Sequence, residues 1–114
     1  MIHAFDVIGD PVRRRILEAL ADGERQAGDL ADLVVAEFGI SRPAVSQHLR
    51  VLREAAFVHV RVDGSRRLYT LDPTPLQAVD LWLDRFRDSW SPRLEALATE
   101  VARGKRKRRK AGEG

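Results

Sequence analysis

SRPAVSQHLRVLREA, residues 41–55, predicts a single helix with two chemically different sides. Ser41 has a side-chain oxygen suited to capping a helix N-terminus, and Pro43 suits the first turn, where its missing N–H would be unpaired anyway. Apolar residues then recur at i, i+4 and i+7, which is the spacing of one stripe that packs on a core. These apolar residues are Val45, Leu49 and Leu52.

The opposite side of this helix carries groups that suit the edges of DNA bases. Arginine can bridge O6 and N7 of guanine, glutamine can bridge N6 and N7 of adenine, and serine can bond a base or a phosphate. Charged outer faces are also normal for surface helices, so an ordinary solvent-facing helix is the alternative. The polar residues on this side are Arg42, Ser46, Gln47, Arg50 and Arg53.

Three helices are expected before this stretch. Residues 4–8 suggest a short first helix, and Asp10 can cap a second helix whose first position is Pro11. A third helix is expected from about residue 27 to residue 38, closed by Gly39. Two helices joined by a short turn that contains glycine are the sequence form of a helix-turn-helix, with a plain helical hairpin as the alternative.

A β-hairpin is expected after the polar helix. Residues 58–62 alternate valine with polar side chains, Asp63-Gly64 supplies a turn, and residues 67–71 return as a second strand. A two-stranded ribbon directly after a candidate reading helix is a wing, and its arginines can reach phosphates or a narrow minor groove. As isolated surface residues they would mean little. They are Arg61, Arg66 and Arg67.

A long C-terminal helix is expected from the Pro73–Pro75 region to about Val101. Its apolar residues are spaced three or four apart over many turns and no further helix follows to cover them, so we expect a homodimer interface, with an intrachain core as the alternative. Ser91-Pro92 predicts a kink or a break near Trp90. The expected interface residues are Val79, Trp82, Leu83, Phe86, Trp90, Leu94 and Leu97.

Composition indicates a soluble globular protein of one domain. The chain has 114 residues, of which 44% are apolar and 32% are charged. No apolar run approaches the ~18 residues of a membrane span and the first ten residues are acidic rather than basic, so we expect a cytoplasmic protein with no membrane partner. Because there is no cysteine, disulfides and thiolate metal sites are excluded.

Charge is distributed unevenly along the chain. Residues 1–102 hold 13 Lys and Arg against 16 Asp and Glu, whereas residues 103–114 hold 7 against 1. We expect residues 1–102 to form the folded domain and residues 103–114 to be a basic, disordered tail. The tail either only aids solubility or acts as a nonspecific arm that binds phosphates.

Several motifs in order resemble the ArsR/SmtB family of bacterial winged-helix repressors. They are DPVRRRILEAL at residues 10–20, the stretch 41–55, and the Asp63-Gly64 wing that ends in Leu68-Tyr69. The resemblance covers about residues 4–100. It implies a mostly helical α+β fold, a winged helix-turn-helix with a two-stranded β wing and a long C-terminal dimerisation helix. Phe5 and Ile8 of the first helix would join the interface.

The same resemblance implies a function and a set of contacts. Members bind double-stranded DNA at an operator as homodimers and repress transcription, often of their own operon, until an effector relieves repression. By position, the implied DNA-binding residues are Ser41, Arg42, Pro43, Ser46, Gln47, His48 and Arg50 on the recognition helix and Arg61, Arg66 and Arg67 on the wing.

Two departures from the family pattern limit the effector. The segment from Leu30 to Ser41 is several residues longer than usual. Metal sensors of the family use cysteine pairs on the third helix or Asp and His on the last helix, whereas this chain has no cysteine and its three histidines, His3, His48 and His59, are scattered. We expect no metal or other cofactor, and the effector is unknown.

Three other functions are alternatives to that of a repressor. A winged helix can present its polar helix to a partner protein, and a basic tail can bind nucleic acid without sequence preference. The third, an enzyme, is not expected, because no nucleophile paired with a base, phosphate-cradling glycine loop or metal set is visible.

Overall fold

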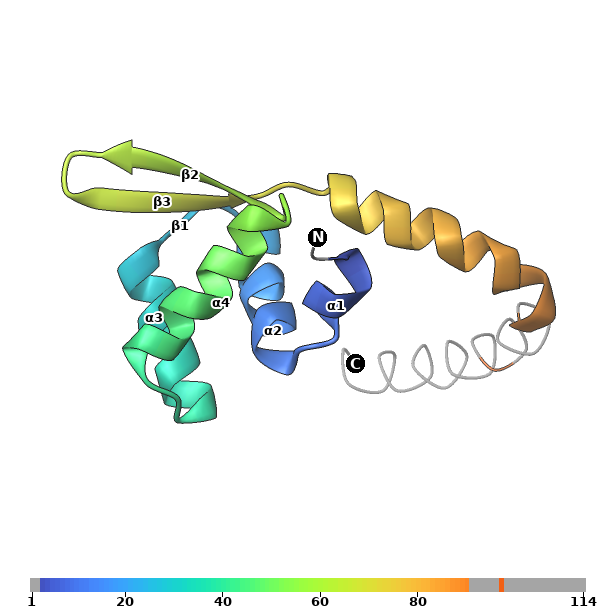
Figure 1. Cartoon of the computed structure of the whole chain (residues 1–114), viewed down its shortest axis with the longest axis horizontal. Helices are drawn as coiled ribbons and strands as arrows, with labels where there is room; N and C mark the ends of the chain where they lie inside the picture. Colours follow the sequence, from blue (N-terminus) through green and yellow to red (C-terminus); the bar gives the residue numbers. More distant parts are fainter. Residues whose placement is uncertain (1–2, 91–96, 98–114) are drawn as a thin grey trace, which may run out of the picture. The chain divides into compact units, whose positions relative to one another are not determined.

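The computed structural model describes residues 3–90 and residue 97. Packing within the chain separates two units, Met1–Val79 and Asp80–Gly114. The elements, shown in Figure 1, are the helices α1 (Ala4–Ile8), α2 (Pro11–Ala21), α3 (Ala27–Phe38) and α4 (Arg42–Glu54), the strands β1 (Arg25–Gln26), β2 (Val58–Asp63) and β3 (Arg66–Leu71), and a helix over residues 74–90.

The helix ends follow from local side chains. Asp10 caps α2, because its Oδ1 accepts the amide N–H groups of Val12 at 2.8 Å and Arg13 at 3.1 Å. Gly39 ends α3 in the left-handed region with φ 67°, which costs glycine little. Ser41 then caps α4 through the amide of Ala44 at 3.2 Å. The helix-turn-helix predicted from the sequence is confirmed.

The apolar stripe of α4 faces the core, as predicted. Val45, Leu49 and Leu52 are all buried, and Phe57, directly after the helix, has no exposed surface. These residues belong to a hydrophobic core whose other members come from every helix of the first unit and from the hairpin. They include Val7, Val12, Ile16, Leu17, Leu20, Leu30, Val34, Val58 and Tyr69.

The chain reverses after α4 without a glycine. Ala56 has φ 62°, its amide donates to the carbonyl of Arg53, and the amide of Phe57 donates to the carbonyl of Leu52 at 2.9 Å. This is a Schellman arrangement, in which the residue after the cap takes the left-handed region. It turns Phe57 inward and directs the chain into β2.

The sheet has three strands in the order β1-β3-β2, all antiparallel. The two-stranded wing is confirmed, but the sequence reading missed β1, whose two residues pair with Leu68 and Tyr69 of β3. A strand this short shows no alternation of its own, so only its partner reveals it. Figure 1 shows the β2–β3 hairpin projecting past the helices.

The hairpin turn lies one residue later than predicted. Asp63 pairs with Arg66, so the two-residue loop is Gly64-Ser65 rather than Asp63-Gly64. Gly64 has φ 62° at the first loop position, while Ser65 does not have a positive φ. That combination is typical of a type II′ turn, whose twist matches the flanking strands.

The C-terminal helix is described over residues 74–90, and residue 97 is also helical. Leu76 packs against the core of the first unit. The predicted kink at Ser91-Pro92, the expected interface residue Leu94 and the expected tail at 103–114 lie outside the described residues. In the part of the chain that is described, no helix combines the length and the apolar character needed to cross a membrane.

Candidate nucleic-acid interface

The outer face of α4 is polar and open to solvent. Gln47 is exposed and lies two positions from both Val45 and Leu49, so it points about 200° away from the buried stripe. Arg42 and Arg50 are also exposed, and each is paired with a carboxylate. Arg42 pairs with Asp32 of α3, and Nε of Arg50 lies 3.0 Å from Oε1 of Glu54 one turn later.

A hollow of about 430 Å³ separates this helix from the wing. Ser46, Arg50 and Arg53 recur at i, i+4 and i+7, so they share the flank of α4 that lines the hollow. β3 contributes Arg67 and Tyr69 on the other side. The remaining lining residues are Ala27, Leu49 and Glu54.

The register of the hairpin separates the wing arginines. Residues directly opposite each other in an antiparallel pair share a face, and faces alternate along each strand. Arg67 pairs with Val62. Arg67 lies two positions before the buried Tyr69, so both side chains are on the same face of the hairpin, and both line the hollow beside α4. Arg61 and Arg66 belong to the intervening pairs and lie on the other face. The expected cluster of three arginines is therefore split between two sides.

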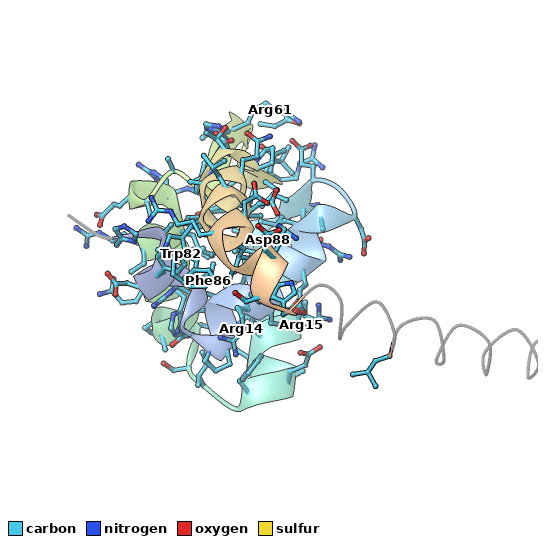
Figure 2. The ribbon with its side chains drawn as sticks, turned by 90° about the vertical axis from the view of Figure 1, so that its right-hand side faces the viewer. Arg14, Arg15, Arg61, Trp82, Phe86 and Asp88 are labelled. Carbon is cyan, nitrogen blue, oxygen red and sulfur yellow. The ribbon has the colours of Figure 1, made fainter. Side chains whose placement is uncertain are left out.

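The arginines on the other face are held by carboxylates. Nη2 of Arg61 lies 2.9 Å from Oε1 of Glu24, in the segment before β1, and Nη2 of Arg66 lies 2.7 Å from Oδ2 of Asp63 across the turn. Figure 2 labels Arg61 at the hairpin. Within the described residues, Arg67 and Arg53 have neither an ion pair nor a side-chain hydrogen bond.

The remaining expected DNA-binding residues have local roles. Ser41 uses its oxygen to cap α4, although the hydroxyl hydrogen is still available as a donor. Pro43 is exposed in the first turn of the same helix. His48 is turned toward α2, where its Nδ1 lies 3.9 Å from Oδ1 of Asp10 and 3.4 Å from Nη1 of Arg13. The structure thus gives His48 a contact between helices.

Asp10 is stabilised as a carboxylate at this contact. Burial is the largest single influence and raises its pKa, but the amide hydrogen bonds from Arg13 and Val12 and the electrostatic interactions with His48 and Arg13 together outweigh it. The pKa of Asp10 is therefore lowered from its ordinary value of 3.8. The start of α2 and the flank of α4 are linked by this charged cap.

The basic run at residues 13–15 is structural rather than a freely solvated face. Arg13 donates to the carbonyls of Val7 and Asp6 at the end of α1, and Arg14 donates to the carbonyl of Ile8 at 2.8 Å. Arg15 pairs with Glu37 of α3 at 2.9 Å, which raises the pKa of the guanidinium. Figure 2 labels Arg14 and Arg15.

Of the expected contact residues, the structure brings Ser46, Arg50 and Arg67 together around one hollow. Arg53 belongs with them, but the residues transferred from the family did not include it, although it lies on the polar side of the helix. The i+7 spacing between Ser46 and Arg53 was the sequence signal that could have identified Arg53. The register of the wing, which places Arg67 on the other side of the hollow, could not be predicted from the sequence. Among the described residues, no three His, Asp or Glu side chains group to hold a metal ion.

Comparisons with known proteins agree with this architecture. The family model for bacterial regulatory proteins of the arsR family matches residues 10–60. The chain is 45% identical over 96 residues to the HTH-type transcriptional regulator Rv2034 of Mycobacterium tuberculosis, covering 84% of this chain and 83% of the relative. It is 37% identical over 86 residues to the transcriptional repressor SdpR of Bacillus subtilis, covering 75% and 91%.

A solved structure gives the same result in three dimensions. The crystal structure of a possible transcriptional regulator for arsenical resistance superposes with a TM-score of 0.65 at 39% identity, covering 88% of this chain and 97% of the other. The winged helix-turn-helix, with a polar reading helix beside a β wing, is thus shared in sequence and in fold. The chain belongs to the ArsR family of bacterial regulatory proteins, which are DNA-binding transcriptional regulators rather than enzymes.

Proposed function

We propose that this protein is a sequence-specific transcriptional repressor that binds a pseudo-palindromic operator as a homodimer in the cytoplasm and controls its own operon. The observation that carries the proposal is the exposed outer face of α4, where Gln47 points directly away from the buried stripe. Repression as the outcome of binding is supported by the relative SdpR, which is a transcriptional repressor.

The proposed contacts follow from the chemistry of that face. Two α4 helices related by a two-fold axis enter successive major grooves about 34 Å apart. Gln47, Arg42 and Arg50 read base edges, the two arginines exchanging their carboxylate partners for guanine. Ser41 and Ser46 position the helix through phosphates. Transcription is blocked because the bound dimer occupies the promoter.

The homodimer is supported by apolar side chains that each unit exposes. On helix 74–90 the rings of Trp82 and Phe86 lie 4.7 Å apart and are 42% and 39% exposed, and Figure 2 shows them on one side of the helix. Leu81, which is not among the interface residues expected from the sequence, is 71% exposed. On α1, Phe5 is 37% exposed. Large exposed aromatic residues are common anchors of protein interfaces.

The other expected interface residues are less open. Ile8 packs partly against the core of the first unit. Val79, Leu83 and Trp90 are half-buried, whereas Leu97 is exposed. We propose that Trp82, Phe86 and Leu97 provide the main area of the dimer contact, with Phe5 adding to it.

Fluorescence anisotropy tests the proposal directly. The protein is titrated into labelled DNA from just upstream of its own gene and into a scrambled duplex, at about 150 mM salt, where nonspecific binding is weak. A preference of about a thousandfold or more for the upstream DNA is expected. Equal, weak binding to both would contradict autoregulation and favour a helix face that meets a partner protein or a tail that binds any nucleic acid.

A further inference from the structure

We propose that Arg53 and Arg67 together bind one phosphate of the DNA backbone in the hollow between α4 and the wing. This inference rests on the proposed DNA-binding function and adds a contact that holds the reading helix and the hairpin on the same strand of DNA. It also assigns different roles to arginines that look equivalent in the sequence.

Arg53 and Arg67 differ from the neighbouring arginines because neither is paired with a carboxylate in the described part of the chain. Arg42, Arg50, Arg61 and Arg66 each have a carboxylate partner, which a phosphate has to displace. Arg53 and Arg67 are the two cations around this hollow that have no such partner among residues 3–90 and 97. Of the charged side chains lining the hollow, three are arginines and one is Glu54, so positive charges outnumber negative ones. The lining therefore attracts an anion.

Arg53 and Arg67 line the same hollow from two different elements. Arg53 lies in the last turn of α4, and Arg67 lies on the face of β3 toward that helix. Both also line a second hollow of about 410 Å³, together with His59, Val60 and Val62 of β2. Arg53 and Arg67 are the two residues that these hollows share.

The two side chains begin from fixed parts of the backbone. Leu52, before Arg53, has no exposed surface, and Leu68 and Tyr69, after Arg67, are 7% and 6% exposed. β1 also pairs with Leu68 and Tyr69, which holds β3 at this point. Because both attachment points are packed, little backbone ordering remains for the moment of binding.

The chemistry of the hollow suits a phosphodiester. A guanidinium offers a planar fork of donors that matches two phosphate oxygens, and two forks can approach one phosphate from opposite sides. The hydroxyl of Ser46 adds a neutral donor on the same flank of α4. Leu49 and Tyr69 contribute apolar surface, which strengthens charge interactions relative to open water.

The experiment compares variants that each remove one positive charge. Arg53→Ala and Arg67→Ala remove the proposed contact, while Arg85→Ala removes the same charge from an exposed position outside α4 and the hairpin. Each full-length variant is titrated against a random-sequence duplex and the upstream duplex over a range of salt concentrations, after its thermal unfolding midpoint is shown to match the wild type.

We expect Arg53→Ala and Arg67→Ala each to weaken binding to both duplexes by about tenfold, and the double variant to lower the salt slope by about one, because the two residues neutralise a single phosphate. The double variant should lose clearly less than the product of the two single losses, because the two residues share one phosphate. Arg85→Ala should change affinity by less than about threefold. Equal losses at all three positions, or a double variant whose losses multiply, would overturn the inference.

The outcome separates this inference from the proposed repressor. If the wild type does not prefer the upstream duplex while Arg53→Ala and Arg67→Ala still weaken random DNA, the repressor proposal fails and the phosphate contact stands. Calorimetric titration with inorganic phosphate in the absence of DNA distinguishes a free anion from the backbone. We expect no saturation up to about 10 mM, the range of weak single-site contacts; saturable binding that the double variant loses would assign the hollow to a free anion instead.

Discussion

Arg13 and His48 are 35 positions apart in the sequence, yet Nη1 of Arg13 lies 3.4 Å from Nδ1 of His48. The same guanidinium donates from Nε to the carbonyl of Val7 at 2.9 Å and from Nη2 to the carbonyl of Asp6 at 2.8 Å. These carbonyls are at the C-terminal end of α1, where backbone acceptors lack intrahelical partners. One side chain therefore ties α1 and α4 to the start of α2.

Arg13→Ala should destabilise the fold by about 2 kcal/mol, because two carbonyls lose charge-assisted hydrogen bonds. The measurement is the free energy of unfolding from urea titration. Arg53→Ala removes the same side chain from an exposed position and should stay within about 0.5 kcal/mol of the wild type. Equal stability of the two variants would show that Arg13 contributes no more than a surface residue.

Asp10 makes stability dependent on acid. Its pKa is lowered in the folded protein, so the carboxylate stabilises the fold fully above its ordinary pKa of 3.8, and this contribution is lost as the pH falls through the folded value. Asp10→Asn keeps a good helix cap but removes the titration. We expect the unfolding free energy of this variant to fall less steeply than that of the wild type between about pH 5 and pH 2.

Asp10→Ala provides the comparison for that experiment. It removes the cap as well as the charge, so it should cost about 1 kcal/mol relative to Asp10→Asn at neutral pH. If Asp10→Asn retains the acid sensitivity of the wild type, other carboxylates are responsible for it.

Gln47→Ala should cost about 1 to 3 kcal/mol at the operator and relax specificity at one base pair. The reason is that Gln47 points away from the core and can bridge adenine N6 and N7. Competition binding with operators varied one base pair at a time measures both effects. An equal loss on scrambled DNA would mean that Gln47 contacts the backbone instead.

Phe86→Glu should weaken the homodimer by at least about thirtyfold, the loss typical of an interface anchor. Sedimentation velocity over a range of protein concentrations measures the change. Asp88→Lys is the matched control, because residue 88 is exposed and lies about 200° around the helix from Phe86. A dimer that survives Phe86→Glu, or that is lost equally in both variants, would move the interface elsewhere.

Deletion of residues 103–114, which hold seven of the 20 cations, should weaken binding to all DNA alike and flatten the salt slope by several units. Anisotropy titrations at four or more salt concentrations measure the slope. A change of sequence preference with the slope intact would contradict a nonspecific role for the tail.

The sequence could predict features whose cause is local. Asp10, Gly39 and Ser41 end or begin helices through their own side chains or backbone freedom, so the start of α2, the end of α3 and the start of α4 follow from a few neighbours. The reversal at Ala56 could not be predicted in this way, because its left-handed backbone is imposed on an alanine by the burial of Phe57.

The candidate site was only partly predictable for a related reason. Polar spacing places Ser46, Gln47 and Arg50 on one exposed side of a helix. The sidedness of the wing depends on the register of the hairpin, which one residue in the turn decides. The pairs Arg42–Asp32 and Arg61–Glu24 join different elements, and only the folded chain brings them together.

The short strand β1 has a mechanical consequence. Gln26 ends β1 and Ala27 begins α3, so the base of the hairpin and the helix-turn-helix are joined within one peptide step. In the described chain, the third strand reaches only Leu68 and Tyr69, and the outer hairpin up to Gly64 is a two-stranded ribbon. Such ribbons twist readily. The base of the hairpin is therefore tied to the helix-turn-helix through α3, whereas the outer ribbon has no third strand to limit its twist.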